Sequence, residues 1–158
     1  MIDLEKVLKK DKKKLYRLLQ FSLYDGSFFI ENVINEDCLF DYTWFDKYFT
    51  DKNRESYFIK YENKIAGFVM VNKHLKVLNE GYSVAEFLIL PYYRRKHFGR
   101  EAAFKVFQLH DKWEIQPMDN NHIAYNFWKN VIKEYTNNNY EVKSFTDMED
   151  VFIFEREM

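Results

Sequence analysis

The sequence predicts an α/β (α+β) fold in which helices flank a sheet, and three observations support this prediction. Apolar residues repeat at helical spacing in the N-terminal third of the chain. The pattern then changes to two strand-like segments joined by a short turn. Beyond them, strand and helix patterns alternate, and two strands close the chain. With 158 residues and no internal repeat, linker or low-complexity segment, the chain is expected to form a single domain over residues 1–158.

The N-terminal part is expected to be helical. Four leucines repeat at spacings of three and four up to a break at residues 25–27: Leu15, Leu18, Leu19 and Leu23. A second helix is predicted for residues 41–49, where four aromatic residues mark one face: Trp44, Phe45, Tyr48 and Phe49.

Strands dominate the middle of the chain. Residues 56–61 and 65–71 are rich in aromatic and β-branched side chains, and the polar residues 62–64 lie between them, which predicts an antiparallel hairpin. A further strand is predicted over residues 83–90, followed by a helix that begins near Gly99. A strand at 112–116, a second helix and two late strands near 140–144 and 150–155 complete the order.

The helix that follows residue 120 has a clear start and a clear apolar face. Asn121 is a good N-cap residue, because its side-chain oxygen can accept a hydrogen bond from an N–H of the first turn. Four residues then repeat at spacings of three and four and predict one apolar stripe: Ala124, Phe127, Val131 and Tyr135.

Composition excludes several classes of function. A formal net charge of -1 gives no overall attraction to nucleic acid or to an anionic membrane, and no apolar run reaches the roughly 18 residues that span a bilayer. The N-terminus lacks the apolar core of a signal peptide, so a cytoplasmic protein is expected. Cys38 is the only cysteine, and the four histidines show no metal-ligand spacing, so we expect no metal site. The chain is expected to be a monomer or a homodimer.

The most informative segment runs from Leu88 to Arg100. An apolar strand passes through a turn that begins at Pro91 into a basic loop, and the next helix begins near Gly99. The first N–H groups of a helix are unpaired and carry partial positive charge, and cationic side chains directly before them favour phosphate. Neither the Walker A pattern nor the three-glycine dinucleotide fingerprint is present. The segment therefore predicts a different kind of pyrophosphate site.

This segment resembles motif A of the GNAT superfamily of acetyl-CoA-dependent N-acetyltransferases, written Gln/Arg-x-x-Gly-x-Gly/Ala. Arg94 takes the first position, His97 stands where the first Gly is usual, and Gly99 takes the second. The stretch from Asn121 to Trp128 is similar to the family's Asn-x-x-Ala-x-x-aromatic-aromatic block. The resemblance covers about residues 56–156. It implies a mixed, mostly antiparallel central sheet flanked by helices, with the helices of residues 1–50 shaping the acceptor side.

The resemblance also implies where acetyl-CoA binds. In the family the cofactor is held mostly by backbone groups of the central strand and of the loop after it. The positions that match are Phe87, Leu88 and Ile89 in the strand, Arg94, Arg95, Lys96, His97, Phe98, Gly99 and Arg100 in the loop, and Asn121. At His97 a Cβ and a ring replace the usual Gly, although His tolerates left-handed backbone angles better than most residues.

Glu86 is the candidate general base. Some members of the family use a carboxylate on this strand to take the proton of the attacking amine. Strand alternation places Glu86 on the same face as Leu88 and Leu90, among apolar groups, and burial there is expected to raise its pKa. The alternative is a Glu at the exposed start of the strand or paired with a neighbouring Lys.

The general acid is open at this stage. Many family members have a Tyr seven residues after the Asn, but here that position is Trp128. Its indole N–H is far too weak an acid, so Trp128 is predicted to pack in the core. Either the thiolate leaves without a dedicated acid, or another tyrosine supplies the proton. Tyr92 and Tyr93 are the options, and Tyr125 is expected on a different part of the helix.

The sequence as a whole predicts transfer of the acetyl group from acetyl-CoA to a primary amine of a small molecule or peptide. One alternative is a catalytically degenerate acyl-CoA-binding sensor or scaffold, and another is an α/β interaction domain without a cofactor. Four aromatic residues with nearby aspartates are candidates for binding a cationic acceptor, although a hydrophobic core explains them equally well: Phe40, Tyr42, Trp44 and Tyr48.

Overall fold

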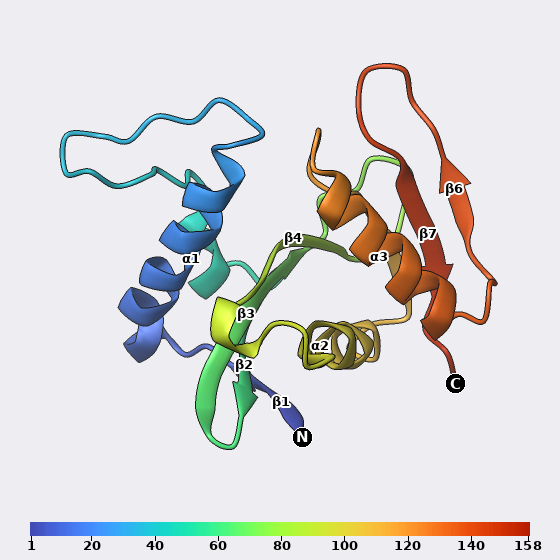
Figure 1. Cartoon of the computed structure of the whole chain (residues 1–158), viewed down its shortest axis with the longest axis horizontal. Helices are drawn as coiled ribbons and strands as arrows, with labels where there is room; N and C mark the ends of the chain where they lie inside the picture. Colours follow the sequence, from blue (N-terminus) through green and yellow to red (C-terminus); the bar gives the residue numbers. More distant parts are fainter.

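The computed structural model describes residues 1–158 and contains seven strands and three α-helices (Figure 1). In chain order these are β1 Ile2–Lys6, α1 Lys12–Gly26, β2 Arg54–Tyr61, β3 Lys64–Asn72, β4 Ser83–Ile89, α2 Phe98–Phe107, β5 Lys112–Ile115, α3 His122–Tyr135, β6 Glu141–Lys143 and β7 Val151–Glu155. Three short 3-10 helices join them: η1 Lys9–Asp11, η2 Phe45–Phe49 and η3 Pro91–Tyr93. No helix is both long and apolar enough to span a bilayer.

The strands form two antiparallel sheets that meet at one point. The first sheet has the order β1-β2-β3-β4 and the second the order β5-β7-β6. Tyr82 joins them through a parallel bridge to Trp113: its N–H donates to the carbonyl of Lys112 at 2.9 Å, and its carbonyl accepts from the N–H of Glu114 at 3.0 Å. Beyond this bridge β4 and β5 do not pair. The predicted mixed, mostly antiparallel sheet flanked by helices is confirmed.

A bulge lies in β4 next to this junction. Met70 is opposite Glu86 and Val71 is opposite Val84, so Ala85 has no partner on β3. A bulge bends its strand and increases the local twist. It therefore turns the second half of β4 relative to its start, at the point where the strand separates from β5.

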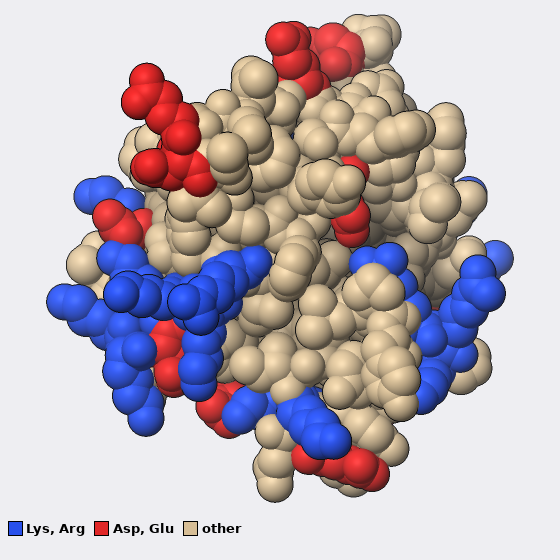
Figure 2. All heavy atoms as spheres, turned by 60° about the vertical axis from the view of Figure 1, so that its left-hand side comes forward, with Lys and Arg blue, Asp and Glu red and all other residues tan.

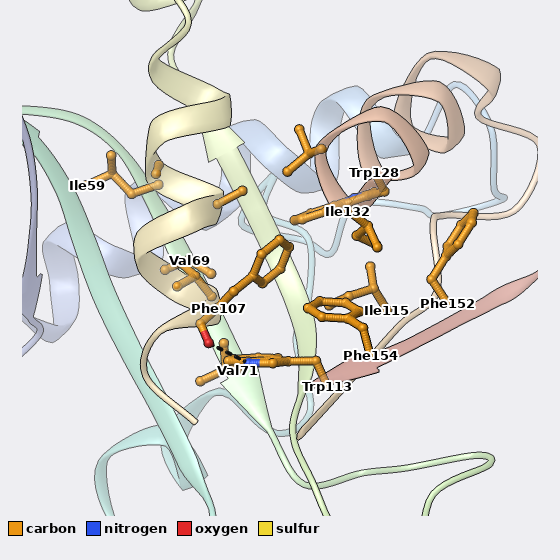
Figure 3. Close-up of a cluster of buried hydrophobic side chains, with 14 of the residues drawn as sticks. Ile59, Val69, Val71, Phe107, Trp113, Ile115, Trp128, Ile132, Phe152 and Phe154 are labelled. Carbon is orange, nitrogen blue, oxygen red and sulfur yellow. Dashed lines mark hydrogen bonds between the residues drawn. The ribbon is translucent and has the colours of Figure 1, made fainter. Parts of the chain in front are cut away.

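The helices cover the two faces of the first sheet. α1 and η2 pack on one face, and α2 and α3 lie on the other side, where they also cover the second sheet (Figure 1). The core between the sheets and α2 and α3 packs five buried aromatic side chains among aliphatic ones (Figure 3). In it, the indole N–H of Trp113 donates to the carbonyl of Phe107 at 3.0 Å, which satisfies the polar atom of a fully buried side chain.

The predicted hairpin is confirmed, and its geometry is tight. Glu62 and Asn63 form the turn with φ of 49° and 65°, as a two-residue hairpin loop requires. Farther along, an ideal Cβ at Gly67 would lie 2.0 Å from the carbonyl oxygen of Leu88. Only a residue without a side chain fits where β3 approaches β4 this closely.

Two predictions about the first fifty residues were wrong. Residues 2–6 form β1, an edge strand of five residues in which only Ile2 is buried. A segment this short with one buried position shows no alternation of apolar and polar residues, so its sequence does not indicate a strand. The helix expected over 41–49 is only the 3-10 turn η2. The segment before it is held by side chains instead of a helix ladder: Gln20 of α1 accepts from the N–H of Phe40 at 2.8 Å and donates to its carbonyl at 2.9 Å.

Candidate active site

A cavity of about 1140 Å³ lies between the end of α1, strand β4, the first turn of α2 and one face of α3. Most of the residues predicted from the sequence line it, although they come from different elements: Glu86, Phe87, Leu88, Ile89, Arg94, Arg95, His97, Gly99, Arg100 and Asn121. Two do not line it. The Lys96 ammonium lies over the ring of Tyr92, 4.8 Å from its centroid, and the Phe98 ring packs on Tyr61 at 4.5 Å.

One end of the cavity is the loop between β4 and α2, whose backbone donors are unpaired. Arg95 and His97 have φ of 65° and 62°, so His97 adopts the left-handed conformation that Gly usually supplies here. No backbone or side-chain acceptor binds the N–H groups of residues 95–97, and no side chain caps the N-terminus of α2. Successive N–H groups in such a turn, followed by a helix N-terminus, form a cradle suited to an anion.

The cationic side chains of this loop have different environments. Arg94 donates from Nε to the carbonyl of Ile89 at 2.8 Å, and its Nη2 lies 3.7 Å from Asp25 of α1. Arg100 forms a bidentate ion pair with Glu134 of α3, at 2.6–2.9 Å. Arg95 has no partner in the protein. It is therefore the one arginine of the loop whose charge no carboxylate offsets.

Gly99 serves a steric purpose. An ideal Cβ at this position would lie 3.1 Å from the Phe127 ring and 3.7 Å from Ile89. α2 thus starts in close contact with α3, and the second Gly of the motif allows that approach. Asn121 caps α3 as predicted, accepting from the N–H of Ala124 at 3.0 Å.

The edge of β4 that faces the cavity is only partly free. Leu90 donates to the carbonyl of Ala66 at 2.7 Å, and residues of an antiparallel strand alternate between partners. The backbone groups of Leu88 therefore point toward β3, and those of Phe87 and Ile89 point toward the open edge. Of the three predicted strand residues, only these two present backbone groups there, and the Ile89 carbonyl is already bound by Arg94.

Glu86 lies near the middle of the cavity wall, on the face of β4 that packs toward α1. Leu88 and Leu90 share that face, as predicted, and pack in the apolar cluster that α1, η2 and the first sheet form between them. The only hydrogen bond to the carboxylate comes from the hydroxyl of Ser22, at 3.2 Å. Burial disfavours the charged form and raises the pKa of Glu86 to about 7, although the Ser22 hydroxyl opposes the rise.

No tyrosine lines the cavity. The Tyr92 side chain is 77% exposed and lies edge-on to Tyr93, so neither option for the general acid is placed to act there. Tyr125 donates to Asp150 at 2.7 Å, which raises its pKa to about 12. Trp128 is buried against Phe87, as the packing prediction requires.

The aromatic residues proposed for the acceptor do not line the cavity. Phe40 and Tyr48 are buried in the core, and Tyr42 packs against the same cluster, where burial raises its pKa and the charge of Glu86 adds to the rise. Trp44 lines a separate hollow of about 320 Å³ beside Arg54. The hydrophobic-core interpretation is therefore correct for Phe40 and Tyr48.

Sequence reasoning missed the cavity residues that come from the end of α1 and the segment after it, and from the segment before α3 and its first turn. They are Ser22, Asp25, Gly26, Phe28, Phe29, Gln116, Met118 and Ile123. These residues belong to no recognised motif, and only the packing of α1 and of the start of α3 around β4 brings them to one cavity. The chain contains no group of three or more His, Cys, Asp or Glu side chains that could hold a metal ion.

Solved structures share this fold. An acetyltransferase from Thermus thermophilus superposes with a TM-score of 0.69 at 12% identity, covering 98% of this chain and 97% of that one. A spermidine N-acetyltransferase from Vibrio cholerae, solved with CoA and spermine, gives 0.65 at 12% identity, covering 98% and 95%. The aminoglycoside acetyltransferase AAC(6')-Ib, solved with coenzyme A, gives 0.66 at 12% identity, covering 99% and 95%. At these identities the likeness concerns the fold.

Sequence comparison identifies the family more directly. No curated protein matches the chain. The model of the acetyltransferase (GNAT) family matches residues 13–131, which run from α1 through β4 and the loop after it into α3. Because this match spans well over half of the 158 residues, the chain belongs to the acetyltransferase (GNAT) family.

Proposed function

We propose that the protein is an N-acetyltransferase that moves the acetyl group of acetyl-CoA to a primary amine by direct attack. One observation carries this proposal: a single cavity joins the unpaired N–H groups of the loop before α2 to the carboxyl group of Glu86. The first suits a diphosphate, and the second suits the removal of a proton from an amine. Neighbouring acetyltransferase structures were solved with CoA or acetyl-CoA, which supports the same cosubstrate here.

The cradle at the start of α2 would bind the diphosphate through backbone donors, with Arg95 adding the charge that no protein carboxylate offsets. The amide arm would follow the open edge of β4, where Phe87 presents its backbone groups. Glu134 does not oppose this binding strongly, because Arg100 holds it in a bidentate pair.

Glu86 would take the proton of the acceptor. A protonated amine has a pKa near 10 and no free electron pair, so it must lose a proton before or during attack on the thioester. A carboxylate with a pKa of about 7 is a better base than an ordinary one and is still largely ionised at slightly alkaline pH. Because no tyrosine lines the cavity, no side chain is assigned as the general acid, and CoA would leave as the thiolate without receiving a proton from the protein.

Two measurements test the proposal together. Calorimetry should detect saturable binding of acetyl-CoA to the whole chain, and a thiol-release assay over a panel of primary amines should detect turnover above the rate of thioester hydrolysis. Binding without turnover for any amine would favour a sensor or scaffold that kept only the cofactor site. No binding at millimolar acetyl-CoA would refute both readings.

Replacing Arg95 with Ala should weaken CoA binding. The loss of one unpaired cation from the diphosphate end is expected to raise the Kd for CoA about five- to tenfold, since a charge-assisted hydrogen bond contributes roughly 1–1.5 kcal/mol at a solvated site. The difference should shrink as salt is added, because the site is open to solvent. Calorimetric titration at low and high salt measures both effects.

Lys96→Ala is the matched control for this experiment. Lys96 is adjacent and equally cationic, but its ammonium lies over Tyr92 and outside the cavity. The Kd of the Lys96→Ala variant for CoA should differ from that of the wild type by less than about twofold. Equal losses for the two variants would mean that only the general charge of the loop matters and would contradict the placement of the diphosphate.

A further inference from the structure

We infer that the acceptor is a primary amine carried on an apolar or aromatic group, and that Phe28 and Phe29 bind that group. The inference rests on the proposed function and names its substrate class. It follows from the exposure and the charges of the part of the cavity that the end of α1 and the segment after it line.

The acceptor end is defined by Glu86. The carboxylate faces α1, and the residues near it come from the end of that helix and the segment after it. Met118, from the segment before α3, and Ile123, from the first turn of α3, line the same cavity. Met118 closes against Gly26, where an ideal Cβ would lie 2.8 Å from the methionine methyl group. The amine would therefore reach Glu86 along the part of the cavity that Phe28, Phe29 and these two side chains line, here called the passage.

The walls of this passage are apolar and exposed. Phe28 is 86% exposed and Ile123 is 81% exposed, and both line the cavity. The rings of Phe28 and Phe29 lie 5.0 Å apart, edge to face. Large apolar side chains grouped at a cavity mouth usually mark a binding surface, because a ligand that covers them removes their contact with water. The face that carries α1 also has a broad uncharged area between its cationic and acidic side chains (Figure 2).

The carboxylates of the cavity are too few to bind a polycation. The cavity holds three carboxylates, and two already face an arginine: Asp25 lies 3.7 Å from Arg94, and Glu134 pairs with Arg100. Only Glu86 remains, and its position suits one amine. A polyamine or an aminoglycoside carries several ammonium groups, and each one that is buried in the cavity loses water without gaining a carboxylate partner. The acceptor class therefore differs from the spermine and aminoglycoside named for two structural neighbours.

The test compares four acceptors on the whole chain with saturating acetyl-CoA, and kcat/KM is expressed per deprotonated amine, because an α-amino group has a pKa of about 8 and an alkylamine one of about 10. The probes are 2-phenylethylamine, a tetrapeptide with an N-terminal Leu, spermidine and kanamycin. We expect kcat/KM for at least one apolar probe to exceed that for spermidine and kanamycin by about thirtyfold, as expected for burying one phenyl or isobutyl group. A preference for the amine or for the peptide distinguishes a small molecule from a protein N-terminus, and either outcome supports the inference.

Phe28→Ala should lower kcat/KM for the preferred apolar probe about tenfold, mainly through KM, while the Kd for CoA stays unchanged. Phe21→Ala is the control, because Phe21 is 56% exposed on α1, close to Phe28 in sequence, and does not line the cavity. The inference fails if spermidine or kanamycin is the best acceptor, or if the two variants behave alike. Calorimetric binding of 2-phenylethylamine and spermidine to the CoA-bound protein decides the point even without turnover, so a failure of catalysis is separable from a wrong acceptor class.

Discussion

Glu86→Gln is expected to lower kcat with the best acceptor by about 10²–10⁴, the range typical for the loss of a positioned general base. The substitution keeps the size of the side chain and an oxygen that can accept from Ser22, so the cavity should remain intact. What it removes is the group that can take a proton. The measurement is steady-state kinetics under saturating acetyl-CoA, with Kd for CoA determined in parallel.

The pH dependence gives a second, independent sign of the same role. Glu86 acts as a base only when ionised, so wild-type activity should rise with pH and reach half its plateau near pH 7. The Gln variant should lose this inflection. A variant that keeps both its kcat and the inflection would show that another group, or solvent, accepts the proton.

Folding provides the control for Glu86→Gln. Burial raises the pKa of Glu86 from an ordinary 4.5 to about 7, so the folded wild type binds a proton that the unfolded chain has lost between these values. The contribution of the Glu86 proton to the free energy of unfolding is therefore fully present below about pH 4.5 and is lost as the pH rises through about 7. Gln carries no charge to bury, so at pH 8 the variant should be at least as stable as wild type. Urea unfolding at pH 5 and pH 8 measures the difference.

Glu114→Ala is expected to destabilise the fold by about 3 kcal/mol or more, because hydrogen bonds to a charged acceptor are strong and their loss leaves donors unpaired. Glu114 is 3% exposed, and its carboxylate accepts from three successive backbone N–H groups: Lys76 at 2.7 Å, Val77 at 3.1 Å and Leu78 at 2.8 Å. These donors belong to the loop between β3 and β4. The midpoint temperature of thermal unfolding should fall by about 6–12 °C for a chain of this size.

Glu114→Gln separates the two contributions to this effect. The amide keeps one acceptor oxygen at nearly the same volume, so it should recover part of the loss measured for Ala. Full recovery would mean that the negative charge is dispensable, and no loss in either variant would mean that the loop does not depend on this anchor. Because Glu114 also donates its N–H to Tyr82 at the junction of the two sheets, amide exchange near Tyr82 should rise in the Ala variant.

The order of strands and helices from residue 54 onward could be predicted because each element carries its own periodicity. The hairpin, Asn121 as the N-cap and the burial of Trp128 are all local in origin. β1 and the loop before η2 could not be predicted, since their conformations depend on partners distant in sequence: β1 pairs with β2, and Phe40 is held by Gln20.

The candidate site divides in the same way. The loop from Arg94 to Gly99 is contiguous, so its motif was visible, and Glu86 stood out as a carboxylate in an apolar strand. Residues such as Asp25 and Phe28 belong to α1 or the segment directly after it and reach the cavity only through tertiary packing. The sequence also could not tell that Arg100 is occupied by Glu134 whereas Arg95 is not, because that depends on how α2 meets α3.

The hydrogen bond from Arg94 to Ile89 has a consequence for how a long ligand is held. It ties the loop to the end of β4, and the contact with Asp25 braces the same side chain against α1. The strand edge and the amide cradle are thus joined through one side chain in the absence of any ligand. Because this connection limits the conformations of the free loop, less conformational entropy would be lost when an elongated ligand binds across both parts.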